Sequence, residues 1–273
     1  MSSGDAPASG DAPASGDALA EFRALNDPER RREIERRGRF FVVEGMLALR
    51  ALVESRYPVR SVLTAENRAA GVLELVGRRA PIYAMPAADL EAIAGFAFHR
   101  GVLASADRLP PQPVDAVVTP AARRLVVVEG VNDHENLGAL FRNAAAFGVD
   151  GVLLDPTTAD PLYRRSVRVS MGHVLRVPWA RIDRWPGTIA DLRQTRGFSV
   201  VALTPAPDAE PIDALAAAPP ERLAFLVGAE GPGLSRHALL AADRQVRIPL
   251  APGVDSLNVA TSAAIALHRL HAQ

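Results

Sequence analysis

The chain has 273 residues and no cysteine, and its 31 basic side chains, all of them arginine, balance 31 acidic ones. The absence of cysteine excludes disulfide bonds, thiolate metal sites and a cysteine nucleophile, and the six histidines show no spacing typical of a metal site. No apolar run approaches the ~20 residues that a membrane helix needs. We therefore expect a soluble, cytoplasmic protein with no membrane partner and no metal, folded as one large or two modest domains.

The N-terminal segment is a repeat of GDAPAS, which begins at Gly4 and again at Gly10. Such sequence cannot bury a core, so residues 1–20 are predicted to form a disordered tail. Seven arginines follow between residues 21 and 39, where Asp27-Pro28 is a helix-start signal. These arginines are interpreted either as contacts to an RNA backbone or as a solvated helix face, and the sequence favours neither.

An α/β unit is predicted over residues 21–106. Its expected strands are 40–43, 59–64 and 81–84, and its expected helices are 45–55, 68–78 and 87–94. The proline-rich residues 107–122 form a stiff linker of the kind that joins domains.

A second unit is predicted over residues 123–273. Its expected strands are 125–128, 152–154, 200–203, 223–227 and 246–250, and its expected helices are 137–147, 164–171 and a last one that Ser256 caps. Strands that alternate with helices predict a parallel sheet, whose ligands bind at the carboxyl ends of the strands.

Three loops at those strand ends carry the polar side chains. The first contains Asn136, a natural helix cap, and leads to Arg142, the only arginine on an Ala- and Leu-rich helix. The second is rich in glycine around Glu230, but its spacing is not the G-x-G-x-x-G of a dinucleotide site, and it is not a P-loop because the chain has no lysine. The third contains Ser256 and Asn258. Taken one at a time, these residues fit helix caps and surface arginines as well as they fit a catalytic site.

Together the loops match three motifs in order and spacing: Asn136-x-Gly138-x-x-x-Arg142-x-Ala144, Gly228-x-Glu230-x-x-Gly233, and Ile248-Pro249 followed by Ser256-Leu257-Asn258-Val259. In these motifs the chain resembles the SpoU (TrmH-like) family of RNA 2′-O-ribose methyltransferases. The resemblance covers residues 124–270 strongly. It is weaker over residues 40–105, through Val43-Glu44-Gly45 and His99-Arg100-Gly101-Val102.

The resemblance implies an α/β fold in which a C-terminal, trefoil-knotted SPOUT methyltransferase domain with a parallel sheet follows a small N-terminal α/β substrate-binding domain. It implies S-adenosylmethionine as cofactor, a homodimer, and transfer of the methyl group to a ribose. The residues at the family's catalytic positions are Arg142, Asn136, Glu230, Ser256 and Asn258. Those at its cofactor positions are Leu203, Thr204, Gly228, Ile248, Leu250 and Leu257; at Leu250 the family often has methionine.

The expected partner is RNA, with ribosomal RNA preferred over transfer RNA. Arg164, Arg165 and Arg168 are the predicted phosphate contacts, and Arg164 and Arg168 share a helix face because they are four residues apart. Two alternatives remain open: a relative that binds RNA without turnover, and an unrelated nucleotide-binding α/β enzyme. The missing nucleotide fingerprints disfavour the second alternative.

Overall fold

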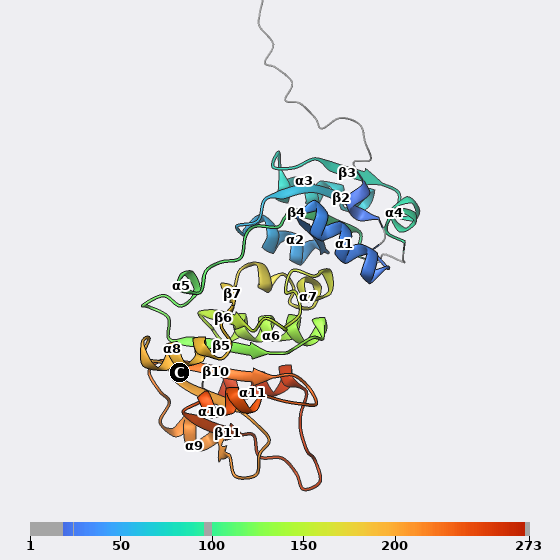
Figure 1. Cartoon of the computed structure of the whole chain (residues 1–273). Coiled ribbons are helices and arrows are strands. Elements are labelled where there is room, and N and C mark those ends of the chain that lie inside the picture. Colours follow the sequence, from blue (N-terminus) through green and yellow to red (C-terminus); the bar gives the residue numbers. More distant parts are fainter. Residues whose placement is uncertain (1–18, 24, 96–99, 271–273) are drawn as a thin grey trace, which may run out of the picture.

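The computed structural model describes residues 19–23, 25–95 and 100–270. Two sheets organise them, one above the other in Figure 1. The upper, N-terminal sheet has the strand order β1-β4-β2-β3, and the lower, C-terminal sheet has the order β7-β6-β5-β10-β8-β11-β9. Of the predicted tail, residues 1–18 lie outside the described residues, as does His99.

The N-terminal unit begins with a 3-10 turn at Ala20–Phe22. Its strands are β1 (Phe40–Glu44), β2 (Val59–Ala65), β3 (Ile82–Met85) and β4 (Val102–Asp107), and its helices are α1 (Pro28–Gly38), α2 (Met46–Val53), α3 (Ala69–Val76) and α4 (Ala87–Ala94). β4 was not predicted from the sequence, because its two alanines and its aspartate have weak strand propensity. Pairing on both sides buries β4 between β1 and β2.

After the short helix α5 (Val114–Val117), the C-terminal unit is a parallel sheet with helices on its faces. Its strands are β5 (Arg124–Glu129), β6 (Gly151–Leu154), β7 (Trp179–Arg181), β8 (Ser199–Leu203), β9 (Glu210–Pro211), β10 (Leu223–Gly228) and β11 (Arg244–Arg247). Its helices are α6 (His134–Ala146), α7 (Arg164–Val169), α8 (Gly187–Gln194), α9 (Ile212–Ala217), α10 (Arg236–Ala241) and α11 (Val259–Leu270). Each strand pairing in this sheet is parallel, which confirms the predicted parallel sheet.

Three predicted boundaries are wrong. The strand expected at 246–250 is Arg244–Arg247, because the prolines that follow cannot continue a ladder. The last helix begins at Val259 rather than at Ser256, since Asn258 supplies its cap: Asn258 Oδ1 accepts from the N–H groups of residues 260 and 261. Asp133, not Asn136, caps α6, because Asp133 Oδ1 accepts from the backbone N–H groups of Glu135 and Asn136 at 2.9 and 2.8 Å.

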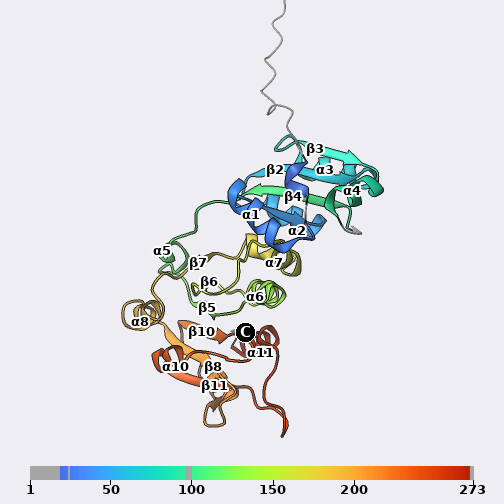
Figure 2. The ribbon, with the colours of Figure 1, turned by 45° about the vertical axis from the view of Figure 1, so that its right-hand side comes forward.

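The two units share one apolar core. A single buried cluster contains Leu49 and Leu52 of α2 together with Leu137 and Phe141 of α6. Figures 1 and 2 both place α7 directly beneath the N-terminal unit. Gly172, just after α7, has φ +83°, and a Cβ there would lie 2.5 Å from the Cβ of Ala51 on α2. Only glycine permits this approach, so packing as well as the linker joins the units.

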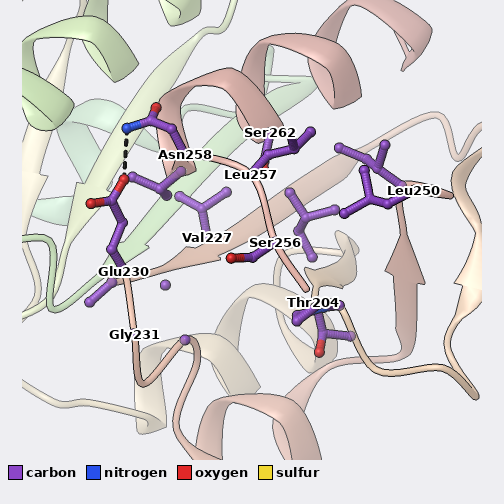
Figure 3. A pocket seen from close by; sticks show the side chains of 16 residues that line it. Thr204, Val227, Glu230, Gly231, Leu250, Ser256, Leu257, Asn258 and Ser262 are labelled. Carbon is purple, nitrogen blue, oxygen red and sulfur yellow. Dashed lines mark hydrogen bonds between the residues drawn. The ribbon is translucent and has the colours of Figure 1, made fainter. Parts of the chain in front are cut away.

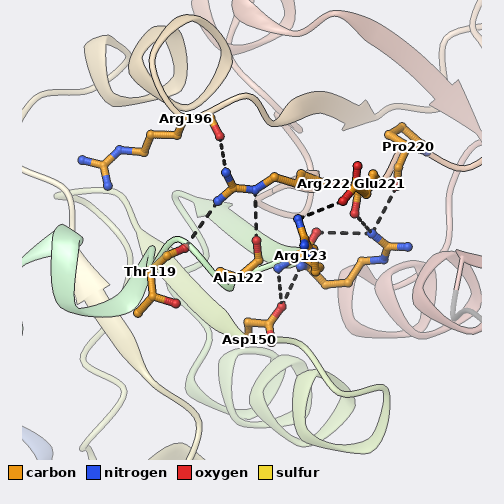
Figure 4. Close-up of polar contacts among 9 residues, drawn as sticks. Thr119, Ala122, Arg123, Asp150, Arg196, Pro220, Glu221 and Arg222 are labelled. Atoms are coloured by element: carbon orange, nitrogen blue, oxygen red, sulfur yellow. Dashed lines mark hydrogen bonds and ion pairs between the residues drawn. The ribbon is translucent and has the colours of Figure 1, made fainter.

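A polar network holds the edge of the C-terminal sheet at the amino ends of β5 and β10 (Figure 4). The Arg222 guanidinium donates to the carbonyls of Thr119, Ala122 and Arg196. Asp150 Oδ2 accepts from the backbone N–H groups of residues 123 and 124 at 2.7 and 2.8 Å. These bonds fix the end of the linker to the strands. The cavity described below lies at the other end of the sheet, at the carboxyl ends of the strands.

None of the helices within the described ranges combines the length and apolar character that crossing a bilayer requires.

Candidate active site

A cavity of about 460 Å³ opens at the carboxyl ends of β8 and β10 and beside the chain that follows β11. All six predicted cofactor residues line it, and so do the predicted catalytic residues Glu230, Ser256 and Asn258. Glu230 and Asn258 face each other at one end of the cavity, while Thr204 and Leu250 lie toward the other end (Figure 3). The cavity also has lining residues that are neither named positions of the three motifs nor predicted site residues, among them Val227, Ala229 and Ser262.

The glycine loop after β10 folds back sharply on the end of its own strand. Ala229 and Gly233 form an isolated antiparallel bridge, in which the Gly233 N–H donates to the Ala229 carbonyl at 3.0 Å. A Cβ on Gly228 would lie 2.4 Å from the carbonyl carbon of Gly233, and Gly231 and Gly233 have φ of +86° and +67°. The glycines therefore let the loop present its backbone to the cavity.

Asn258 joins the three motif loops. Its Nδ2 donates to Asn136 Oδ1 and to Glu230 Oε1, both at 2.7 Å. Because its Oδ1 at the same time caps α11, the side chain is held in one orientation by bonds at both ends. One amide thus connects the start of α6, the glycine loop and the start of α11, although Asn136 and Glu230 lie 122 and 28 residues from Asn258 in the sequence.

The glycine of the first motif, Gly138, is required by the packing of two helices. A Cβ on Gly138 would lie 2.7 Å from the Ser166 carbonyl oxygen and 2.9 Å from the Val169 Cβ, so this glycine lets α6 and α7 pack closely. Arg142 lies on the exposed side of α6 and does not line the cavity. Within the part of the chain that the structure describes, its guanidinium makes no hydrogen bond or ion pair. The structure therefore assembles Asn136, Glu230 and Asn258 but leaves Arg142 apart.

The three arginines of α7 have different surroundings. The Arg164 guanidinium contacts Glu44 Oε2 of β1 at 2.6 Å and the Leu25 carbonyl at 3.1 Å, so it links the two units. Arg168 lies 4.0 Å from Glu44 and 3.9 Å from Glu135. Arg165, whose side chain is 56% exposed, lies 3.7 Å from Glu135. Arg165 and Arg168 remain more open to a phosphate than Arg164, whose side chain is 20% exposed.

Asp155, at the end of β6, is a buried carboxylate that the sequence analysis missed. Burial raises its pKa, but hydrogen bonds from the Gly130 N–H, from the Thr157 hydroxyl, and from the hydroxyl and N–H of Thr158 outweigh burial and hold the pKa below its usual value. Arg181 donates to the carbonyls of Asp155 and Thr158, each at 2.8 Å. The loop after β6 is thereby fixed beside the loop after β5. Its Asp-Pro-Thr-Thr sequence is a turn signature that could have indicated this arrangement.

Among the residues that the structure describes, no three His, Cys, Asp or Glu side chains are grouped so as to hold a metal ion.

A ligand-sized cavity at the carboxyl edge of an open parallel sheet is typical of α/β proteins that bind a small molecule at their strand ends. The model of the SpoU rRNA Methylase family matches residues 123–268 of this chain. The chain belongs to that family, which confirms the resemblance predicted from the three motifs.

An uncharacterized tRNA/rRNA methyltransferase of Mycobacterium tuberculosis is 46% identical over 245 residues, which cover 89% of this chain and 84% of the relative. The solved structure of an AdoMet-bound rRNA methyltransferase from Sinorhizobium meliloti has a TM-score of 0.77 at 24% identity, with 94% of this chain and 95% of that chain covered. The SpoU methyltransferase AviRb from Streptomyces viridochromogenes, in complex with AdoMet, has a TM-score of 0.75 at 24% identity, with coverage of 93% and 97%. These two structures have the same fold as this chain.

Proposed function

We propose that the protein transfers a methyl group from S-adenosylmethionine to a ribose 2′-hydroxyl of RNA. The observation that carries the proposal is the hydrogen-bonded group of Asn136, Glu230 and Asn258 at the rim of the cavity. The similarity to the tRNA/rRNA methyltransferase of M. tuberculosis and to two solved structures that contain AdoMet (S-adenosylmethionine) supports the same chemistry.

The cavity suits this cofactor. Leu203, Ile248, Leu250 and Leu257 offer apolar contacts to an adenine ring, and the turned-back backbone around Gly228 offers hydrogen-bonding groups to the polar parts. Thr204 adds a hydroxyl at the same wall. The cofactor, when bound, supplies a methyl group on a sulfonium; the protein must orient that group and exclude water from it.

Arg142 orients the ribose hydroxyl and stabilises the developing alkoxide. A guanidinium keeps its proton up to a pH above ~12, so it is a poor base, and an RNA phosphate oxygen accepts the hydroxyl proton instead. The 2′ oxygen forms its bond to the methyl carbon as the carbon–sulfur bond breaks. Ser256, Asn136, Glu230 and Asn258 position the two reactants.

Arg142 of a second copy of the chain completes the site in a homodimer. Its lack of an internal partner within the described residues, and its place outside the cavity lining, support this arrangement. We also propose that residues 123–273 form a trefoil-knotted SPOUT domain. The placement of β10 between β5 and β8, and the packing of α11 against α6, support that threading.

The RNA lies across both units. Residues 21–106 form the substrate-binding domain, residues 107–122 the linker, and Arg165 and Arg168 the phosphate contacts beside the site, while Arg164 aligns the two units through Glu44. Ribosomal RNA is the preferred substrate and transfer RNA the alternative. The family's description as rRNA methylases and the rRNA methyltransferase of S. meliloti support this preference.

The test is transfer of labelled methyl from S-adenosylmethionine to total ribosomal RNA and, separately, to total transfer RNA, with Arg142→Ala as control. We expect label in ribosomal RNA, recovered as a 2′-O-methyl nucleoside after digestion and lost in the variant. Cofactor binding without label in either pool would favour an RNA-binding relative without turnover. A chain that binds no S-adenosylmethionine would overturn the proposal.

A further inference from the structure

Glu129 is a buried carboxylate directly behind the glycine loop. It is the last residue of β5, only 9% exposed, and it stands opposite Gly228 in the register of β5 and β10. Its Oε1 accepts from the indole Nε1–H of Trp185 and its Oε2 from the backbone N–H of Ser235, both at 2.7 Å. Neither contact is apparent from the sequence, because the three residues lie far apart in it.

Ser235 is the point at which the glycine loop ends. Its hydroxyl caps α10 by accepting from the Ala238 N–H at 3.2 Å, so its backbone N–H is the last group of the loop before a helix. The loop is therefore held in three places. Gly228 is fixed in the ladder with β5, the tip is fixed where Glu230 accepts from Asn258, and the end is fixed on Glu129.

The chemistry of Glu129 is unusual for a purely structural residue. Within the described part of the chain it makes no ion pair, and two neutral N–H donors satisfy its charge in a buried place. A buried charge held in this way is costly unless both oxygens keep their donors. An apolar residue would fill the same space without that cost, so the carboxylate indicates a requirement for two acceptors that point at the loop and at Trp185.

We propose that Glu129 is a positioning residue for the cofactor: it fixes the end of the glycine loop so that the loop backbone and Glu230 are preset for binding. This inference rests on the proposed function, because it takes the cavity as the cofactor site. Loss of the bond between Glu129 and Ser235 would let the loop shift by fractions of an ångström and weaken cofactor binding. The proposed RNA contacts, Arg165 and Arg168, would stay in place.

The sharpest test acts on the donor at Ser235. Ser235 has φ −62°, which proline adopts without strain, so Ser235→Pro removes the N–H that Glu129 accepts. Ser235→Ala removes the same capping hydroxyl but keeps the N–H, and is the matched control. We expect Ser235→Pro to raise the KM and the Kd for S-adenosylmethionine about tenfold relative to Ser235→Ala. The kcat and the KM for RNA should stay within about threefold of the control.

Glu129→Gln provides the second variant, because an amide offers one acceptor oxygen and turns an N–H₂ toward the other donor. It should raise the cofactor KM by a similar factor. The double variant Glu129→Gln/Ser235→Pro should be little worse than either single variant, because the amide oxygen can then accept from Trp185 while the amide nitrogen faces a position without an N–H.

Several outcomes would overturn the inference. One is Ser235→Pro and Ser235→Ala with equal cofactor affinity; another is additive effects in the double variant. A fall in kcat and a rise in both KM values together, with a lowered melting temperature, would indicate a merely structural role. If the wild-type chain fails to bind S-adenosylmethionine in the same titration, the proposed function fails instead, and the two failures are thereby distinguished.

Discussion

At the scale of single residues, the Asn258 side chain performs two separable tasks. Its Oδ1 caps α11, and its Nδ2 bridges Asn136 and Glu230. We expect Asn258→Ala to cost about 1 kcal/mol of stability through the lost cap and to reduce methyl transfer strongly. Asn258→Asp keeps the capping oxygen but sets a carboxylate against Glu230, so it should lose activity with a smaller fall in melting temperature. Near-normal turnover of Asn258→Asp in the labelled assay would contradict the bridging role.

Arg142, in contrast to Asn258, is expected to contribute nothing to the stability of the fold. Since its guanidinium has no internal partner among the described residues, Arg142→Lys should leave the melting temperature unchanged. A lysine ammonium cannot hold two oxygens in a planar fork, so kcat should fall more than about tenfold. Titration with S-adenosylmethionine should give wild-type affinity, because Arg142 does not line the cavity. A Lys variant with near-normal turnover would show that a point charge suffices.

At the scale of elements, the loop after β6 depends on the Asp155 carboxylate. The folded-state pKa of Asp155 lies below its ordinary value of 3.8, so the carboxylate stabilises the fold above the unfolded-state pKa, and this contribution is lost as the pH falls through the folded-state pKa. We expect Asp155→Asn to cost roughly 1–3 kcal/mol at pH 7 through lost acceptors. The difference from wild type should shrink below about pH 4.

Urea unfolding at pH 7 and pH 3 measures this difference directly. Asp208→Asn is the matched control, because Asp208 is exposed and makes no hydrogen bond or ion pair with any described residue. A difference between wild type and Asp155→Asn that stays constant over this pH range would exclude the carboxylate as its cause.

Several strands could be predicted from the sequence, whereas two helix caps could not. Apolar runs predicted β5, β6, β8 and β10, because strands buried on both faces require them. The caps were misassigned to Asn136 and Ser256, since Asp, Asn and Ser all suit a cap and only backbone geometry selects one. The six residues at the family's cofactor positions line one cavity, as the three motifs led us to expect, because the motif loops follow strands of the same parallel sheet. Glu129 was missed because its role depends on contacts that no local pattern encodes.

At the scale of the whole molecule, the sequence predicted two domains on a linker, and the structure describes two sheets that share a core. The apolar cluster spans both units, and Glu44 of the N-terminal sheet lies against Arg164 of the other unit. No sequence pattern indicates this contact between the units, because a glycine such as Gly172 is common at the end of any helix and its approach to α2 is a property of the fold. The arrangement fixes the N-terminal sheet relative to the cavity, so under the proposed function an RNA that binds both units would meet one preset geometry.

Gly172 provides the test of that fixed arrangement. Gly172→Ala introduces both an unfavourable positive φ and a Cβ within 3.1 Å of the Ala48 Cα, whereas Gly197→Ala has a similar φ of +67° and nothing within 4 Å. The two variants should share the backbone strain, of order 1 kcal/mol, and differ only at the junction, that is, the contact between Gly172 and α2.

We expect Gly172→Ala alone to enlarge the radius of gyration in solution scattering and to expose the linker at residues 109–113 to proteolysis. Its KM for RNA should rise about tenfold, while the affinity for S-adenosylmethionine stays unchanged, because neither Gly172 nor any residue of α2 or α7 lines the cavity. Identical scattering, proteolysis and RNA kinetics in the two variants would mean that the junction does not set the geometry for RNA.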